Sequence, residues 1–118
     1  MNTSIIYKPL VSNEVLDALA NELPAIIAAA LEIPGGRLAI LKPEQVSLEF
    51  SQASPRDVGS DIRIMVFARS NDPRASTENN LAKSILEKVI TLVEKSGGKH
   101  SVNIRLYLME IGVAEYSY

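Results

Sequence analysis

Few side chains in this sequence belong to the types that commonly carry out catalysis or bind metals. There is no cysteine and a single histidine, His100, which excludes thiolate nucleophiles and the usual zinc ligand sets. Glu110 and Glu115 could act as bases, but nothing pairs either of them with a second carboxylate. There is no glycine-rich phosphate-binding motif, and Gly98-Lys99-His100 only terminates a helix. The sequence therefore identifies no catalytic residue, predicts no metal or cofactor, and predicts a solvent-exposed His100.

The basic residues Arg105 and Arg69 are better candidates, for ligand binding. Arg105 lies inside a long apolar segment that reads as a strand, on the sheet face that the helices are not expected to cover. An arginine that becomes partly buried needs an anionic partner. That partner is either a carboxylate of a neighbouring copy or an anionic ligand. Arg69, at the end of another expected strand, has a similar case.

The first half of the chain predicts a strand, a helix and a second strand. Residues 5–7 are rich in β-formers and are followed by Pro9, which ends the strand. Ser12 can cap a helix that begins near Asn13, and Pro24 should kink that helix or divide it. Pro34-Gly35-Gly36 should end the helix. Residues 45–50 then alternate between apolar and polar side chains, as a half-buried strand does.

The second half repeats this order. Residues 51–61 read as a loop and residues 62–68 as a strand closed by Asn71-Asp72-Pro73. Ser76 can cap a second helix, which Gly97-Gly98 should end. A long fourth strand is expected from residue 102 to about residue 113.

This order predicts one α/β domain over residues 1–118, a two-layer α+β sandwich of two βαβ units at about residues 4–51 and 61–114. A four-stranded mixed sheet would carry both helices on one face. The other face should be polar in a monomer, yet the third and fourth strands place apolar residues there as well: Met65, Phe67, Tyr107, Met109 and Ile111. Because such a face needs cover, the sequence predicts self-association, unless the C-terminal segment folds back over it.

Composition excludes several partners and locations. A formal net charge of −2 gives no general attraction to nucleic acid or anionic lipid. The longest apolar run, residues 25–31, is far shorter than the ~20 residues that span a bilayer. The first residues, Met1-Asn2-Thr3-Ser4, do not resemble a signal peptide, so a soluble cytoplasmic protein is expected.

Two segments resemble a known family. Lys42-Pro43-Glu44-Gln45-Val46 is similar to the Lys-Pro-x-Gln-aromatic segment of macrophage migration inhibitory factors. Val102-Asn103-Ile104-Arg105-Leu106-Tyr107 is similar to their strand after the second helix. Together with the order of elements over residues 4–116, these segments resemble the tautomerase superfamily, in the branch of migration inhibitory factor and 5-carboxymethyl-2-hydroxymuconate isomerase.

The resemblance implies a homotrimer whose sheets face inward and whose active sites lie between subunits. It implies that Lys42 lines a substrate pocket and that Arg105 stands where the family has a small polar pocket residue. The family's base is the amine of an N-terminal proline, whereas this chain places Asn2 or Thr3 there, and the nitrogen of Pro9 lies within a peptide bond.

We therefore expect a relative with little or no tautomerase activity that binds a small anionic ligand, such as an oxo acid or aromatic carboxylate, through Lys42, Arg105 and Arg69. A relative that keeps the trimer only for binding or assembly is also consistent with the sequence. So is a ferredoxin-like dimeric small-molecule-binding or assembly module, because that fold has the same order of elements.

Overall fold

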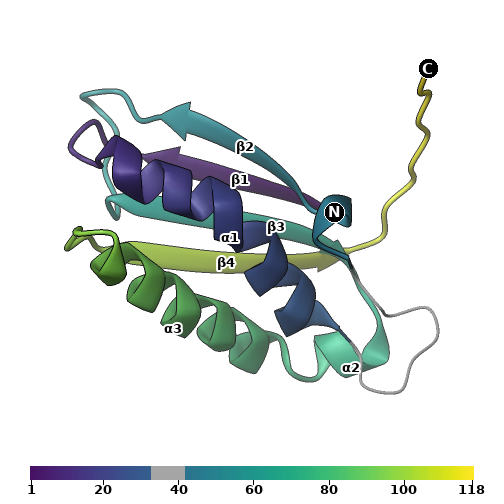
Figure 1. Ribbon diagram of the computed structural model, residues 1–118. Coiled ribbons are helices and arrows are strands. Elements are labelled where there is room, and N and C mark those ends of the chain that lie inside the picture. The colour runs from purple at the N-terminus through teal and green to yellow at the C-terminus, as the bar shows by residue number, and fades with distance from the viewer. Residues whose placement is uncertain (33–41) are drawn as a thin grey trace.

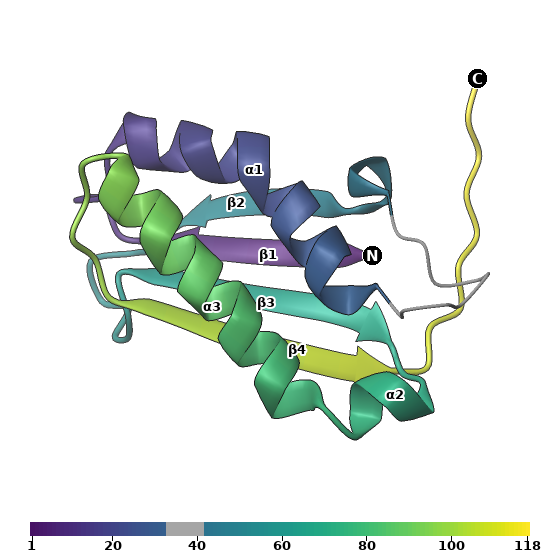
Figure 2. The same cartoon turned by 60° about the horizontal axis from the view of Figure 1, so that its bottom comes forward.

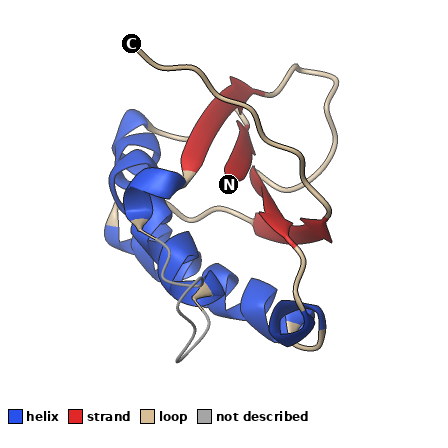
Figure 3. Ribbon diagram, turned by 90° about the vertical axis from the view of Figure 1, so that its right-hand side faces the viewer, coloured by secondary structure: helices blue, strands red, loops and turns tan. Residues whose placement is uncertain are grey.

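The protein folds into a four-stranded mixed sheet with its helices on one face, as a computed structural model of residues 1–32 and 42–118 shows (Figure 1). In chain order the elements are β1 (Asn2–Tyr7), α1 (Asn13–Leu31), the 3₁₀ turn η1 (Pro43–Gln45), β2 (Ser47–Gln52), β3 (Ile62–Arg69), α2 (Asp72–Ala75), α3 (Glu78–Lys95) and β4 (Val102–Met109). The two layers separate clearly when the molecule is viewed from its end (Figure 3). The predicted helix end at Pro34-Gly35-Gly36 lies outside the described residues.

The strand order distinguishes the two folds that share this order of elements. The order is β2-β1-β3-β4, with β1 parallel to β2, β3 parallel to β4, and β1 antiparallel to β3. A ferredoxin-like sheet splits each βαβ unit by inserting a strand between its two parallel strands. Here the two strands of each unit are hydrogen-bonded neighbours, so the ferredoxin-like alternative is wrong and the two units lie side by side.

Helix α1 forms as its sequence predicts and bends at its middle. The Ser12 side chain accepts a hydrogen bond from the Val15 amide (3.4 Å), which caps the first turn. Pro24 lies inside the helix. The axis of α1 changes direction about midway along its length, and the helix is not divided in two (Figure 2). The prediction of a kink is confirmed, and the alternative of two separate helices is wrong.

Several boundaries differ from the sequence prediction: β1 begins at Asn2 rather than at residue 5, and β2 covers residues 47–52 rather than 45–50. Residues Asp72–Ala75 form the short helix α2, whose N-cap Asn71 accepts from the Arg74 amide at 2.9 Å. Ser76 ends α2, and Thr77 is the N-cap of α3, so the prediction that Ser76 caps the second long helix is wrong. Strand β4 ends at Met109, before the predicted end near residue 113, because the chain has no β partner after that point among the described residues.

The core lies between the sheet and the two long helices. Its fully buried members are aliphatic side chains from both layers: Ile5, Val15, Leu19, Leu23, Ile27, Ile62, Ile64, Val66, Ile85 and Val89. The turn after α3 closes one end of this core. There the Gly98 amide donates to the Val93 carbonyl (3.1 Å) and Gly97 takes a positive φ of 89°.

Gly98→Ala is expected to lower the free energy of unfolding by roughly 1–3 kcal/mol. A Cβ at this position would lie 2.9 Å from Cγ2 of Val15 and 2.8 Å from Cδ2 of His100, so a buried neighbour must move. Chemical denaturation would measure the change. Gly112→Ala is the matched control, since its Cβ would meet nothing within 4 Å, and equal stability of the two variants would contradict the prediction.

Candidate functional site

The face of the sheet opposite the helices, which we call the open face, carries most of the candidate functional side chains. Alternation along β3 sends Ile62, Ile64 and Val66 into the core and leaves Met65 and Phe67 half-buried on the other side. The strand register then aligns side chains of neighbouring strands on the open face: Asn2, Phe67 and Tyr107 in one row; Glu49, Ser4, Met65 and Arg105 in the next; Ser51, Ile6, Arg63 and Asn103 in the third. The predicted two-sided character of β3 and β4 is confirmed for Met65, Phe67, Tyr107 and Met109, whereas Ile111 lies beyond the end of β4.

A hollow of about 420 Å³ lies on the β3–β4 half of the open face. Arg63 and Arg105 contribute guanidinium groups to it, Met65 and Tyr107 contribute apolar surface, and the loop at Val58–Ser60 borders it. The Tyr107 ring is stacked on that of Phe67, with centroids 5.0 Å apart. This combination of two cations with an aromatic floor suits a small ligand that has a carboxylate and an apolar body.

The two guanidinium groups of the hollow are only partly satisfied. Arg105 donates from Nε to Oδ1 of Asn103 (3.2 Å), and no carboxylate of the described residues lies within 4.0 Å of it. Arg63 Nη2 lies 4.0 Å from Oδ2 of Asp57, while its Nε is buried without a hydrogen-bond partner among the described residues. The Arg63 side chain is 30% exposed, so an anion can still reach its outer nitrogens as well as the Arg105 guanidinium.

Asp57 is held by its own turn. Its carboxylate accepts from the Ser54 amide at 2.9 Å and from the Ser54 hydroxyl at 3.1 Å. These hydrogen bonds, and after them the charge of Arg63, hold the pKa of Asp57 below its ordinary value. Asp57 is therefore a carboxylate beside the Arg63 guanidinium, 4.0 Å away and partly exposed.

The start of β1 forms a second hollow, also of about 420 Å³, lined by Asn2, Ser4, Ser47, Glu49 and Phe67 among others. The Met1 amino group donates to the Gln45 carbonyl (3.2 Å), and the Ser47 amide donates to the Met1 carbonyl (2.8 Å). Glu49 is the one ionisable side chain among the residues that line this hollow.

The three basic residues singled out from the sequence do not come together within one chain. Lys42 is exposed and precedes β2, where its amide donates to Oε1 of Gln45 (2.9 Å). Arg105 lies on β4, at the opposite edge of the sheet from β2. Arg69 is exposed at the end of β3 and donates to the Ile111 carbonyl (3.2 Å). Of the three, only Arg105 lines the hollow at Arg63, a residue that the sequence analysis did not single out.

The prediction of a solvent-exposed His100 is wrong. Its side chain is only 9% exposed, and Nδ1 lies 3.4 Å from Oδ2 of Asp61, whose other oxygen is 3.5 Å from Nζ of Lys8. The ring fits there because Gly98 leaves it room. Among the described residues no group of three or more His, Cys, Asp and Glu could hold a metal ion.

Sequence reasoning also missed Arg74, the one charged side chain in the buried class within the described part of the chain. Its Nε and Nη2 donate to the Leu31 carbonyl at 3.3 and 3.0 Å, and its Nη1 donates to the Arg69 carbonyl at 2.9 Å. Burial lowers its pKa from the ordinary value for arginine. Arg74 thus joins the end of α1 to the end of β3 and has a structural role.

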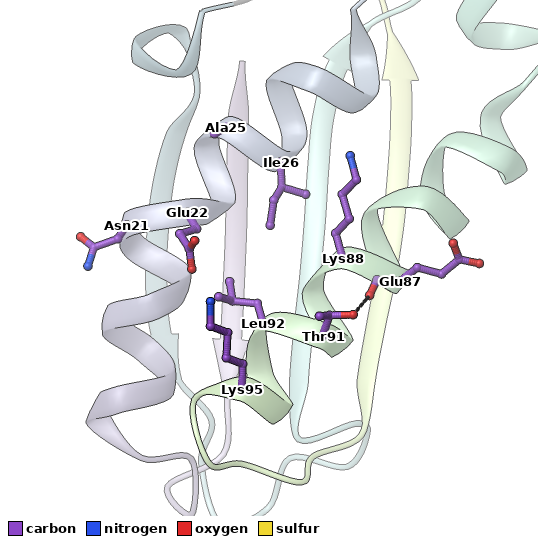
Figure 4. A pocket seen from close by; sticks show the side chains of 9 residues that line it. All are labelled: Asn21, Glu22, Ala25, Ile26, Glu87, Lys88, Thr91, Leu92 and Lys95. Carbon is purple, nitrogen blue, oxygen red and sulfur yellow. Dashed lines mark hydrogen bonds between the residues drawn. The ribbon is translucent and has the colours of Figure 1, made fainter.

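A third hollow, of about 500 Å³, lies between α1 and α3 on the far side of the molecule from the open face. Figure 4 shows Ile26 pointing into it from α1, while Lys88 and Lys95 extend from α3. Its rim also carries Glu22 and Glu87, so cations and anions are mixed there. The open face, where two arginines converge on aromatic surface, is the stronger candidate. No helix in the described ranges has the length and hydropathy of a membrane span.

Comparison with known proteins identifies the fold. No family model and no curated protein matches the sequence. Among solved structures, a fused 4-OT that forms an asymmetric trimer aligns with 96% of this chain and 92% of its own, at a TM-score of 0.68 and 11% identity. A member of the cis-3-chloroacrylic acid dehalogenase family aligns over 92% and 75% (TM-score 0.67, 14% identity). Malonate semialdehyde decarboxylase aligns over 100% and 92% (TM-score 0.66, 10% identity).

These structures belong to one superfamily and share the two-layer architecture described above. The finer resemblance to the migration inhibitory factor branch stays a prediction. The chain therefore has the fold of the tautomerase superfamily.

Proposed function

We propose that this protein assembles as a homotrimer and binds a small anionic ligand, an oxo acid or an aromatic carboxylate, in a pocket between subunits, with little or no tautomerase activity. The observation that carries the proposal is the pair Arg63 and Arg105 in a hollow floored by Met65 and Tyr107. A carboxylate in the hollow could accept from the accessible nitrogens of Arg105 and from the outer nitrogens of Arg63, whose side chain is 30% exposed.

Assembly is supported by the apolar side chains on the β3–β4 half of the open face. Met65, Phe67, Tyr107 and Met109 are adjacent on β3 and β4, opposite the helices. Fused 4-OT, which has the same fold, occurs as symmetric and asymmetric trimers. Because Lys42 and Arg105 lie at opposite edges of the sheet, a ring of subunits would be needed to bring them to one ligand.

The expectation of low activity rests on the start of β1. Abstraction of a proton next to a carbonyl requires a neutral base with a pKa near the working pH. The side chains of Asn2, Thr3 and Ser4 offer an amide and two hydroxyls, none of which is such a base. We therefore expect the protein to bind its ligand without converting it.

Arg105→Ala is expected to weaken binding of phenylpyruvate roughly 10- to 100-fold, because one charged hydrogen-bonding group is worth about 1.5–3 kcal/mol. Titration calorimetry on the assembled protein would measure the affinity, and enol–keto absorbance would follow turnover. Arg56→Ala, which removes an exposed arginine of the loop before β3, is the matched control and should bind as the unmodified protein does.

Two results would contradict the proposal. The first is unchanged affinity in Arg105→Ala. The second is rapid tautomerisation by the unmodified protein that persists when its α-amino group is blocked. A variant that lacks the residues before Ser4 and carries Ser4→Pro after the initiator methionine tests the converse, since it supplies the amine base that we expect to be missing.

A further inference from the structure

The last nine residues, 110–118, leave the end of β4 and run clear of both layers (Figures 1 and 2). They form no helix or strand. Ile111 is half-buried, whereas Val113 is 74% exposed and Tyr116 is 83% exposed. The start of the segment is held in place, because Arg69 donates to the Ile111 carbonyl (3.2 Å) and the Ser70 amide donates to the Met109 carbonyl (3.0 Å).

The segment has the side-chain pattern of an extended strand. Ile111, Val113 and Glu115 are spaced by two residues, so an extended backbone places them on one side. The rings of Tyr116 and Tyr118, also two residues apart, lie 5.5 Å from each other. Within residues 110–118 the charged side chains are Glu110 and Glu115, and there is no basic residue.

The open face carries the complementary pattern twice. Along β4, Met109, Tyr107 and Arg105 follow one another at two-residue spacing, and along β3 the same is true of Phe67, Met65 and Arg63. Along each of these strands, two apolar side chains are followed by an arginine. Along residues 111–115, two apolar side chains are followed by a glutamate. Strand spacing is the same on both sides, but the register sets the β4 pattern one pair further along than the β3 pattern. A segment that runs antiparallel to β3 can place Ile111, Val113 and Glu115 beside Phe67, Met65 and Arg63, with Arg105 next to Met65 on the neighbouring strand.

We propose that residues 110–118 of one copy lie extended over the β3–β4 half of the open face of a second copy. Ile111 and Val113 cover the apolar side chains of β3 and β4 on this face, and the Glu115 carboxylate enters the hollow between Arg63 and Arg105. The inference rests on the self-association proposed above and extends it, because the segment then occupies the place of the small anion and competes with it.

Because the protein has no cysteine, introduced thiols test this contact directly. Separate batches carrying Val113→Cys and Met65→Cys are mixed under oxidising conditions, with one batch tagged so that mixed dimers are resolved by mass. A disulfide requires the two Cα atoms to lie within about 7 Å of each other, so a mixed dimer reports the proposed contact. The matched control pairs Val113→Cys with Lys83→Cys, an exposed position on α3, and should give at least tenfold less product.

A charge exchange gives an independent measurement. Glu115→Arg and Arg105→Glu should each weaken association about tenfold in sedimentation, and the double variant should recover most of the loss. A chain that carries both cysteines could instead form only an intramolecular disulfide. In that case the segment folds back over its own sheet, and the inference is overturned. A protein that sediments as a trimer but gives no mixed disulfide also overturns the inference and leaves the proposed assembly standing. A monomeric unmodified protein overturns both.

Discussion

Replacing Arg74 with leucine is expected to lower the free energy of unfolding by about 3 kcal/mol. Arg74 is 7% exposed, and its hydrogen bonds to the Leu31 carbonyl are buried, so water has little access to replace them. Leucine would leave the Leu31 carbonyl at the end of α1 and the Arg69 carbonyl at the end of β3 without the donors that now lie 2.9–3.3 Å away. It would also remove a cation from the end of α1, where the helix dipole favours one.

Urea denaturation at a fixed protein concentration would measure this loss, since association changes apparent stability. Arg74→Lys keeps the charge but not the planar fork of donors, so it should recover part of the stability. Arg56→Ala, on the exposed loop, should change the free energy of unfolding by less than about 0.5 kcal/mol. A loss within that limit for Arg74→Leu would show that the buried guanidinium does not hold α1 to β3.

Arg74 also shows where prediction from sequence ends. Its partner Leu31 lies 43 positions earlier in the chain, and no local pattern connects the two. The prediction of an exposed His100 failed because the partners of its side chain are also distant in sequence. Its surroundings include Gly98, Val15 and Asp61, which meet only in the folded protein. Periodicity reports which face of an element is buried, but it does not report which distant residues meet there.

The elements themselves could be predicted because their patterns are local. Alternation along β3 and β4 identified both faces of these strands, and Ser12 and Pro24 marked the start and the bend of α1. The strand order could not be predicted, because two folds share the same succession of elements and differ only in which strands become neighbours. The hydrogen-bonded pairing of β1 with β2 decides between them.

The candidate site was predicted only in part, because some of its residues stand out locally and others matter only through strand pairing. Arg105 was found because a charge inside an apolar strand is conspicuous in the sequence. Arg63 has the same property, two residues before Met65, but it gained significance only when the register placed β3 beside β4 and Arg63 in the same hollow as Arg105. Lys42 came from the family resemblance, and a single chain does not bring it to that hollow.

Tyr107→Asp is expected to weaken self-association roughly 10- to 100-fold, because it removes a large aromatic contact and adds a buried carboxylate that Arg63 and Arg105 compensate only in part. Tyr107 lies among the apolar side chains on the β3–β4 half of the open face, between Arg105 and Met109 on its own strand and beside Phe67 on β3. The substitution removes the stacked ring and places a charge where a second copy would cover it. Met109→Lys, at the end of the same row, should act in the same direction with a smaller effect, since Met109 is already 38% exposed.

Sedimentation velocity over a range of concentrations would measure the association constant, and thermal unfolding followed by circular dichroism would show that the subunit remains folded. Leu10→Asp is the matched control, because Leu10 is 62% exposed in the turn after β1 and lies outside the open face. Loss of assembly in both variants would indicate a general effect of added charge. Loss in Tyr107→Asp alone would place the interface on the open face. A Tyr107→Asp protein that still sediments as the unmodified protein does would show that the open face does not mediate association.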